Sequence, residues 1–257
     1  MAWPVFTETP TIVGHRGMGK GLVDGFRGNT IDSFLAALEA GATWVEVDVQ
    51  RTADDELVVS HNPDLPDGTL LAEVTAEQAA RQGPVLVTQL LDALPSDAGV
   101  VFDVKSSLPD ASRLGSSTTA ALLAQKCRRV LGDRPALACS FDPAALSHMR
   151  VEMPSLALGL LTWFRFPIAH AVAAAAHLDV QVLAAHAGSL WANASSGWPG
   201  MPTPERLIDQ VHGTQRQLLV WCPSTRRARM LARAGVDAMV VDDVPKHVEA
   251  AARVRRA

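Results

Sequence analysis

The chain has 257 residues, of which 48% are hydrophobic and 19% are charged, and its formal net charge is −4. This length and composition allow one large buried core, and the slightly acidic charge gives no electrostatic basis for nucleic acid as a partner. Its three cysteines are too widely spaced for a thiolate zinc site, and no apolar run is long enough for stable membrane insertion, so we expect a cytoplasmic protein.

Apolar segments typical of β-strands alternate with helical patterns along the whole chain, which indicates parallel βα units. Strands are expected at Thr11–Gly14, Trp44–Val49, Val100–Val104, Ala136–Phe141, Leu156–Leu161, Val180–Ala184, Gln217–Trp221 and Ala238–Val241. Helices are expected at Thr30–Ala40, Ser117–Leu131, Pro143–Arg150, Pro167–His177, Pro204–His212 and Ser224–Ala234. Eight units in this length predict an α/β fold, a closed (β/α)8 TIM barrel. A doubly wound open sheet is the alternative, although no glycine-rich dinucleotide motif or P-loop follows any strand.

The second expected strand carries two acidic residues, Glu46 and Asp48, within an otherwise apolar run. Side chains two residues apart project from the same face of a strand, so the two carboxylates lie close together. Like charges in a buried strand repel and lose hydration unless a cation lies between them, and this favours a metal site. The alternative is an edge strand whose polar face is in contact with water.

Other polar residues occur at or after the ends of neighbouring strands, where the chemistry of such barrels collects. His15 and Arg16 follow the first strand, and Asp103 and Lys105 end the third. The segment from Glu56 to Ser60 reads as a strand returning antiparallel to the second, and this hairpin would carry His61 back over the barrel mouth.

A series of short motifs spans most of the chain. They are His15-Arg16-Gly17, Gly28-Asn29-Thr30, Ser33-Phe34, Gly41-Ala42, Glu46-Val47-Asp48-Val49, Thr52 with Asp54, Val58-Val59-Ser60-His61, Asp103-Val104-Lys105, Ser140-Phe141, Val220-Trp221, Gly235-Val236-Asp237 and Val241-Asp242. Their types and order resemble those of the glycerophosphodiester phosphodiesterases.

The resemblance implies a single barrel domain over residues 1–257, with a small insertion after the second strand at about residues 60–83. It also implies Glu46, Asp48 and Asp103 as ligands of a divalent cation, Mg²⁺ or Ca²⁺. It further implies His15 and His61 as the acid and base, and Arg16 and Lys105 as phosphate-binding cations. A hard, oxygen-liganded cation and two basic side chains can stabilise the negative charge that develops on the oxygens of a phosphodiester during the reaction. Histidines titrate near neutral pH and suit proton transfer.

Three residues depart from the family pattern. Gly28 stands where Glu is common, Asn62 where Asp is common, and Asp103 where the third acidic ligand is usually Glu. Because Asp is shorter than Glu by one methylene, the cation would shift or be reached through water.

The expected reaction is metal-dependent hydrolysis of a small-molecule glycerophosphodiester to glycerol 3-phosphate and an alcohol. One alternative is a lysophospholipase D-like reaction, with a cyclic phosphate product, which exposed apolar surface around Trp191 and Trp198 would favour. Another is a non-catalytic phosphate- or metal-binding barrel.

Trp221, at the end of the seventh strand, has two expected roles. Its ring either stacks on a choline-like head group or packs within the barrel. The sequence leaves open the leaving alcohol, the choice of ion, which histidine is the base, and the oligomeric state.

Overall fold

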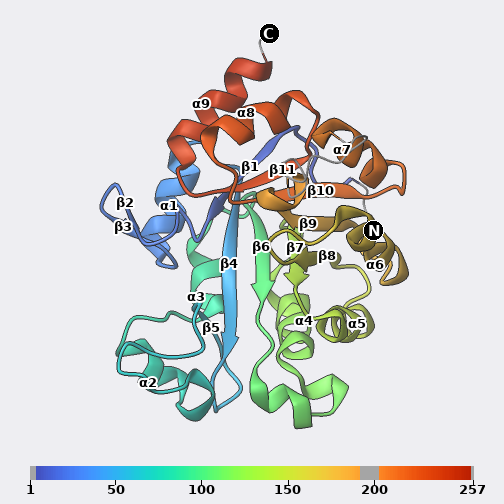
Figure 1. Cartoon of the computed structure of the whole chain (residues 1–257). Helices are drawn as coiled ribbons and strands as arrows, with labels where there is room; N and C mark the ends of the chain where they lie inside the picture. Colours follow the sequence, from blue (N-terminus) through green and yellow to red (C-terminus); the bar gives the residue numbers. More distant parts are fainter. Residues whose placement is uncertain (1–3, 192–202, 256–257) are drawn as a thin grey trace.

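The computed structural model describes residues 4–191 and 203–255. Within those residues, eight parallel strands close into a barrel, because β1 pairs with both β11 and β4 (Figure 1). The barrel strands are β1 (Thr11–His15), β4 (Trp44–Arg51), β6 (Gly99–Val104), β7 (Ala136–Ser140), β8 (Ala157–Thr162), β9 (Val182–His186), β10 (Gln217–Trp221) and β11 (Ala238–Val241). The predicted (β/α)8 barrel is confirmed, and each predicted strand lies within two residues of its observed bounds.

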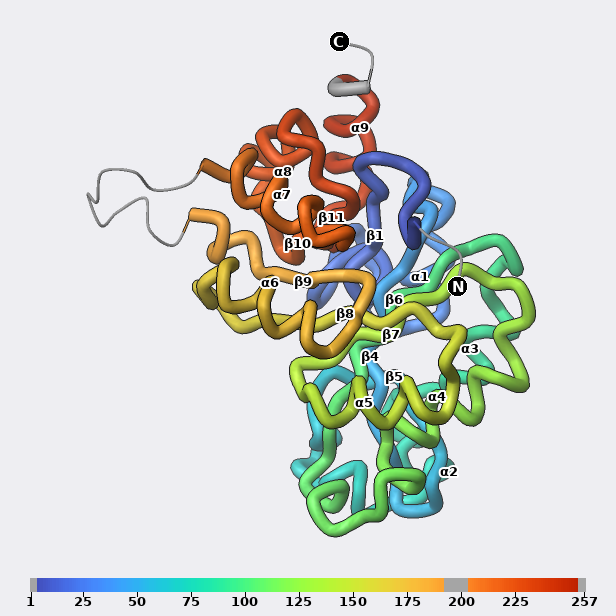
Figure 2. Tube along the Cα trace, turned by 90° about the vertical axis from the view of Figure 1, so that its right-hand side faces the viewer, coloured from blue at the N-terminus to red at the C-terminus, as the bar shows by residue number. Residues whose placement is uncertain are grey.

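Helices follow the barrel strands and cover the outside of the barrel. They are α1 (Ile31–Glu39), α2 (Ala76–Ala80), α3 (Val87–Ala93), α4 (Thr119–Val130), α5 (Pro143–Glu152), α6 (Ile168–His177), α7 (Pro204–His212), α8 (Thr225–Arg233) and α9 (Val244–Arg255). The sequence patterns did not predict α2, α3 or α9. Figures 1 and 2 both place α2 and α9 at opposite ends of the molecule. In the described part of the chain, no helix is long and apolar enough to span a membrane.

Local sequence explains how the helix after β1 begins and ends. The Thr30 side chain accepts a hydrogen bond from the Ser33 backbone N–H, which caps the first turn of α1. Phe34 and Ala37, three residues apart, lie on the buried face, and Gly41 follows the helix with φ of 99°. The helix therefore starts immediately after the loop that carries Asn29, and this loop reaches the barrel mouth.

A short hairpin extends β4 at its carboxyl end. The predicted returning strand is confirmed as β5 (Leu57–Val59), which pairs antiparallel with β4. Between β5 and β6 lie the 3₁₀ helix at Leu71–Glu73, α2 and α3. The 3₁₀ helix and α2 share a small apolar cluster that includes Leu65, Leu71 and Ala79, whereas α3 packs on the main core. A second hairpin, β2 (Leu22–Val23) with β3 (Phe26–Arg27), follows β1.

Alternation along the barrel strands decides which polar residues face the interior. The inner core takes one alternating set of side chains, and Phe6 packs edge-to-face on Trp44 within it. On several strands, an apolar residue of this inner core is followed two positions later, toward the carboxyl end, by a polar or aromatic residue on the same face. These pairs are Val13 and His15, Trp44 and Glu46, Val101 and Asp103, Leu219 and Trp221, and Val240 and Asp242. The same pattern that fills the barrel therefore gathers the chemically active groups at one end of it.

Candidate active site

Three carboxylates from two adjacent strands form the centre of this end of the barrel. Asp48 on β4 lies in register with Asp103 on β6, and Glu46 lies one inward-facing position earlier on β4. One oxygen from each of the three lies within 4.8 Å of the others. Glu46 and Asp48 are buried, so the edge-strand alternative, with these groups in contact with water, is wrong.

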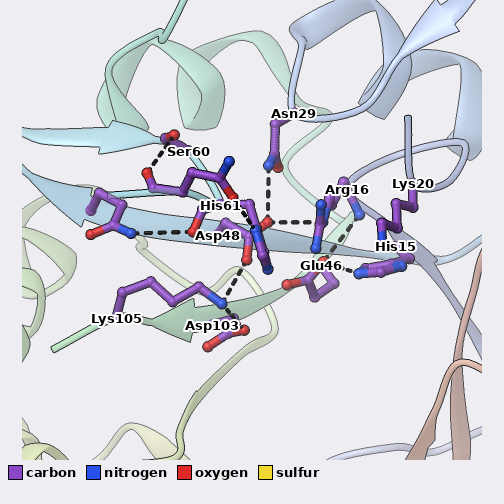
Figure 3. A network of polar contacts seen from close by, with 12 residues as sticks. His15, Arg16, Lys20, Asn29, Glu46, Asp48, Ser60, His61, Asp103 and Lys105 are labelled. Carbon is purple, nitrogen blue, oxygen red and sulfur yellow. Dashed lines mark hydrogen bonds and ion pairs between the residues drawn. The ribbon is translucent and has the colours of Figure 1, made fainter. Parts of the chain in front are cut away.

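Two basic side chains neutralise Asp48. Arg16 Nε lies 3.0 Å from Asp48 Oδ2, and Lys105 Nζ lies 2.9 Å from Asp48 Oδ1 (Figure 3). Asn29 donates a further hydrogen bond to Oδ2 at 2.9 Å, and Lys105 also pairs with Asp103. Burial alone would raise the pKa of Asp48, but Lys105 and Arg16 outweigh it and lower that pKa below its usual range. Asp48 is therefore held as a carboxylate.

The other two acids, Glu46 and Asp103, have less positive charge beside them than Asp48 has. Burial, with the neighbouring Asp48 charge, raises the pKa of Glu46 to about 8. Burial also raises the pKa of Asp103, although Lys105 opposes it. Within the described residues, Asp103 Oδ1 is buried with no hydrogen-bond partner. Burial and mutual repulsion oppose the ionisation of these carboxyls, and a divalent cation between the converging oxygens would offset both effects, so the donor set fits such a cation.

His15 lies between this cluster and a fourth carboxylate. Its Nε2 lies 3.9 Å from Glu46 Oε2, while its Nδ1 lies 2.6 Å from Asp242 Oδ1. Burial lowers the pKa of His15, but the hydrogen bonds to Asp242 and Cys222 and the charge of Glu46 together outweigh burial and raise that pKa to about 10. A carboxylate on one ring nitrogen fixes the tautomer and turns the other nitrogen toward the cavity. The sequence patterns assigned no role to Asp242, although it directly follows β11, the strand that pairs with β1.

His61 lies at the rim of the same cavity, at the end of the β5 hairpin. Its backbone oxygen accepts from Gln50 Nε2 at 3.2 Å, and the preceding Ser60 N–H bonds to the backbone oxygen of Asp48 at 3.1 Å. The ring Nδ1 lies 2.8 Å from Asn62 Oδ1. With that oxygen as acceptor, Nδ1 carries the proton and Nε2 is left to act on a ligand. His61 is exposed, unlike His15, so the two histidines differ in their access to solvent.

The cavity at this end of the barrel has a volume of about 820 Å³ and two chemically different sides. The charged residues form one side, and the other is apolar, with Phe141, Leu161, Trp163 and Trp221. Trp163 stacks on Phe141 with 4.2 Å between ring centroids, and Trp221 meets Phe141 edge-on at 6.1 Å. In the described part of the chain, Trp221 Nε1 is buried without a hydrogen-bond partner. A ligand with one anionic and one apolar portion would match both sides.

The aromatic residues after β9 are arranged differently from this wall. His186 packs on Trp221 at 4.4 Å, and its Nδ1 accepts from the Gly188 N–H. Trp191 packs against the outer core, with the Arg227 guanidinium 4.8 Å from its ring centroid. Trp198 lies outside the described residues. In the described part of this segment, His186 therefore packs against the wall residue Trp221.

The structure gives a physical reason for the glycine at position 28. A Cβ atom there would lie 2.8 Å from the backbone oxygen of Gly19 and 3.3 Å from the Cβ of Arg16. The Gly28 N–H also bonds to the backbone oxygen of Gly21 at 2.8 Å. The loop before β2, at Gly19 and Gly21, thus lies against Gly28 and takes the space that a larger side chain would need.

Comparison with protein families gives one match that spans nearly the whole chain. Residues 15–246 match the model described as the glycerophosphoryl diester phosphodiesterase family. Among curated proteins, glycerophosphocholine phosphodiesterase GDE1 of Candida albicans is 46% identical over 65 residues, which cover 23% of this chain and 5% of that protein. Its counterpart in Schizosaccharomyces pombe is 44% identical over 55 residues, 20% of this chain and 5% of that protein. The matched segment is therefore a small part of these longer proteins.

Solved structures share the fold at low sequence identity. A glycerophosphodiester phosphodiesterase from Parabacteroides distasonis superposes with a TM-score of 0.76 and 20% identity, covering 96% of this chain and 98% of that one. An Oleispira antarctica phosphodiesterase, solved in complex with the product sn-glycerol-3-phosphate, gives a TM-score of 0.74 and 20% identity, covering 95% and 97%. These likenesses extend over the whole barrel.

Proposed function

Because the chain belongs to the glycerophosphoryl diester phosphodiesterase family, we propose that it hydrolyses glycerophosphodiesters to glycerol 3-phosphate and an alcohol. The observation that carries this proposal is the convergence of three carboxylates, Arg16, Lys105 and His15 at one end of the barrel. The product bound in the Oleispira antarctica relative is consistent with it. Family membership in a group of phosphodiesterases also leaves the non-catalytic alternative without support.

In this proposal Glu46, Asp48 and Asp103 hold Mg²⁺ or Ca²⁺. Such an ion, when bound, supplies positive charge that stabilises the charge developing on the phosphate oxygens. Arg16 and Lys105 bind the remaining phosphate oxygens, and their ion pairs with Asp48, which hold both cations beside the carboxylate cluster, support this role. Trp221 presents its ring and its unpaired N–H to the substrate.

The two histidines transfer the protons. His15 accepts, through Nε2, the proton of the attacking group, which is either the glycerol 2-hydroxyl or a water molecule. A cation held by Glu46 would offset the carboxylate charge beside His15 and lower its pKa from about 10, which would leave Nε2 free to accept. His61 donates a proton to the oxygen of the leaving alcohol as the bond between phosphorus and that oxygen breaks. Attack by the 2-hydroxyl gives a cyclic phosphate, which water then opens. Asp242 is a positioning residue that holds the His15 ring through Nδ1.

The direct test measures glycerol 3-phosphate released from glycerophosphocholine and glycerophosphoethanolamine. Metal-stripped protein is assayed before and after Mg²⁺ or Ca²⁺ is restored, with His61→Ala as the control. Activity that returns with the metal and is missing from the control supports the proposal. Folded wild-type protein that releases no product with either ion contradicts it.

A second candidate reaction is favoured by the apolar rim of the cavity. Trp163 is 65% exposed and Leu108 is 88% exposed, yet both line the cavity. Apolar side chains so exposed beside a binding site are typical of surfaces that receive apolar ligands. A lysophospholipid presents the same diester with an acyl chain attached, and that chain would lie along this rim. Release of lysophosphatidic acid or its cyclic form from lysophosphatidylcholine distinguishes this reaction from the first.

A further inference from the structure

Three side chains of different types that bind metals in proteins lie together at the catalytic end of the barrel, and two of them, His15 and Cys222, line the cavity described above. His15 ends β1, Asp242 follows β11 and Cys222 follows β10, and these three strands are neighbours in the barrel. One ligand atom from each lies within 4.8 Å of the others. His15 Nδ1 is 2.6 Å from Asp242 Oδ1 and 3.8 Å from Cys222 Sγ. The reaction proposed above gives no role to the Cys222 thiol.

The arrangement differs from that of a nucleophile, a base and an orienting carboxylate. In such a triad the nucleophile and the carboxylate lie on opposite nitrogens of the imidazole. Here the thiol and the carboxylate both approach the same nitrogen, Nδ1. The thiol is therefore not placed to pass its proton through the ring. Sulfur, nitrogen and oxygen instead surround one point, which is the geometry of a chelate.

We propose that His15, Cys222 and Asp242 form a second metal site, separate from the carboxylate cluster, that binds a thiophilic divalent cation such as Zn²⁺. Thiolate, imidazole and carboxylate are the ligands that zinc takes in proteins. In a tetrahedral zinc site, sulfur and nitrogen ligands lie about 3.6 Å apart and nitrogen and oxygen ligands about 3.4 Å apart. The sulfur–nitrogen pair already matches, and the nitrogen–oxygen pair needs to open by less than about 1 Å.

Binding at this site involves no redox chemistry. The cation displaces the Nδ1 proton of His15 and the thiol proton of Cys222, and both protons go to solvent. The resulting thiolate and carboxylate balance the two positive charges of the ion, and water completes the tetrahedron. Asp242 provides the entry path, because its side chain is 46% exposed.

Occupancy of the site has a functional consequence that rests on the proposed reaction. The Nε2 of His15 faces Glu46, while Nδ1 would be bound to the metal. A metal on Nδ1 withdraws charge from the ring and fixes it, so His15 becomes a poorer proton acceptor. Zinc would then inhibit the enzyme while Mg²⁺ or Ca²⁺, which avoid thiolate ligands, would not compete for this site.

The binding test uses Co²⁺ as a spectroscopic probe, with Mg²⁺ in excess to occupy the carboxylate cluster. A thiolate ligand gives a near-ultraviolet charge-transfer band that carboxylates and imidazole do not give. Wild-type protein and the control Cys127→Ala, which removes a core thiol from α4, should show the band, and Cys222→Ser should lack it. Absence of the band from the wild type, or its persistence in folded Cys222→Ser, would overturn the proposal whatever the activity of the enzyme.

A second measurement needs no variant and so does not depend on a variant folding. Zn²⁺ should slow alkylation of Cys222 in the wild type by at least about tenfold, since a coordinated thiolate is shielded, and leave Cys127 and Cys139 unaffected. An unchanged alkylation rate of Cys222 would contradict the site.

A third measurement tests the inhibitory role. Zinc inhibition, measured relative to each variant's own activity, should require about tenfold more Zn²⁺ in Cys222→Ser than in Cys127→Ala, because one ligand is lost. Equal sensitivity of the two variants to Zn²⁺ would contradict the inhibitory role of the site. Metal binding and hydrolysis are each judged by their own tests.

Discussion

The Nδ1 atom of His15 lies 2.6 Å from Oδ1 of Asp242, although 227 positions separate the two residues in the chain. Closure of the barrel explains the contact, because β1 and β11 pair in parallel and their carboxyl ends meet. Burial raises the pKa of Asp242, but the hydrogen bond and charge of His15, with the hydrogen bonds from Lys20 and Cys222, together outweigh burial and lower that pKa to about 2. The contact therefore links the position of His15 to the ionisation of Asp242.

Asp242→Asn should destabilise the protein in a pH-dependent way. Because the folded-state pKa is below the usual 3.8, the stabilisation by Asp242 is complete above that value and is lost as pH falls toward 2. At pH 7 we expect a loss of roughly 1 kcal/mol, since Asp242 is half exposed. Urea denaturation from pH 5 to pH 3, below the range in which His15 titrates, should show a difference that shrinks below pH 4. Asp179→Asn, at a highly exposed site, is the control, and a difference that stays constant to pH 3 would argue against the linkage.

Replacement of the two histidines should have different effects on different leaving groups. His15→Ala and His61→Ala should each lower kcat by about 10²–10⁴-fold on glycerophosphocholine, because each removes a proton-transfer group. A glycerophosphodiester with a nitrophenolate leaving group needs no acid, so His61→Ala should recover most of its activity on it and His15→Ala should not. The opposite pattern would exchange the two roles, and near-normal activity of either variant on glycerophosphocholine would remove that residue from the mechanism.

Asp103→Asn should weaken binding of the divalent cation. An ion at about 100 times its Kd stabilises the folded protein by about 2.7 kcal/mol, so Mg²⁺ or Ca²⁺ should raise the Tm of the wild type. The variant loses one anionic ligand and should lose most of that shift. Asp92→Asn, which changes an exposed acid on α3, should keep it. Equal shifts in both variants would exclude Asp103 as a ligand.

Gly28→Ala should destabilise the fold by about 1–3 kcal/mol, because the new methyl group meets the backbone oxygen of Gly19. Gly115→Ala is a matched control, since its methyl group would meet only the end of the His148 side chain at 3.1 Å. Urea denaturation measures both. Equal stabilities of the two variants would mean that the loop before β2 yields easily and does not dictate glycine at position 28.

Trp163→Ala should distinguish substrates by their apolar portion. If the rim receives an acyl chain, kcat/KM for a lysophospholipid should fall about tenfold, the value of one aromatic contact, and kcat/KM for glycerophosphocholine should change little. Val151→Ala removes an exposed apolar side chain on α5, away from the cavity, and serves as the control. Equal losses on both substrates would assign Trp163 to packing against Phe141.

The barrel was predictable because strand patterns and helix caps are local. Gln217–Trp221 and Ala238–Val241 were placed at their observed bounds, since short apolar runs between polar turns leave little choice. By contrast, α9 was missed because its first turn carries Pro245 and its face is weakly apolar.

The site was predictable only in part, for a physical reason. Glu46 and Asp48 were conspicuous because charged residues are rare within a buried strand. Asp242 was part of a motif but had no assigned role, and Cys222 was not singled out, since their importance depends on which strands become neighbours when the barrel closes. The clash that explains Gly28 likewise requires the path of the loop before β2.

Barrel closure also has a consequence for the order of events during synthesis. His15 lies on the first barrel strand to leave the ribosome, and its partner Asp242 follows the last one. A nascent chain that has exposed the first seven barrel strands thus carries the carboxylate cluster's residues without the group that orients His15. Contacts between such distant segments form slowly. Catalytic competence should therefore arise only after the eighth barrel strand, with Asp242 behind it, has emerged and paired with β1.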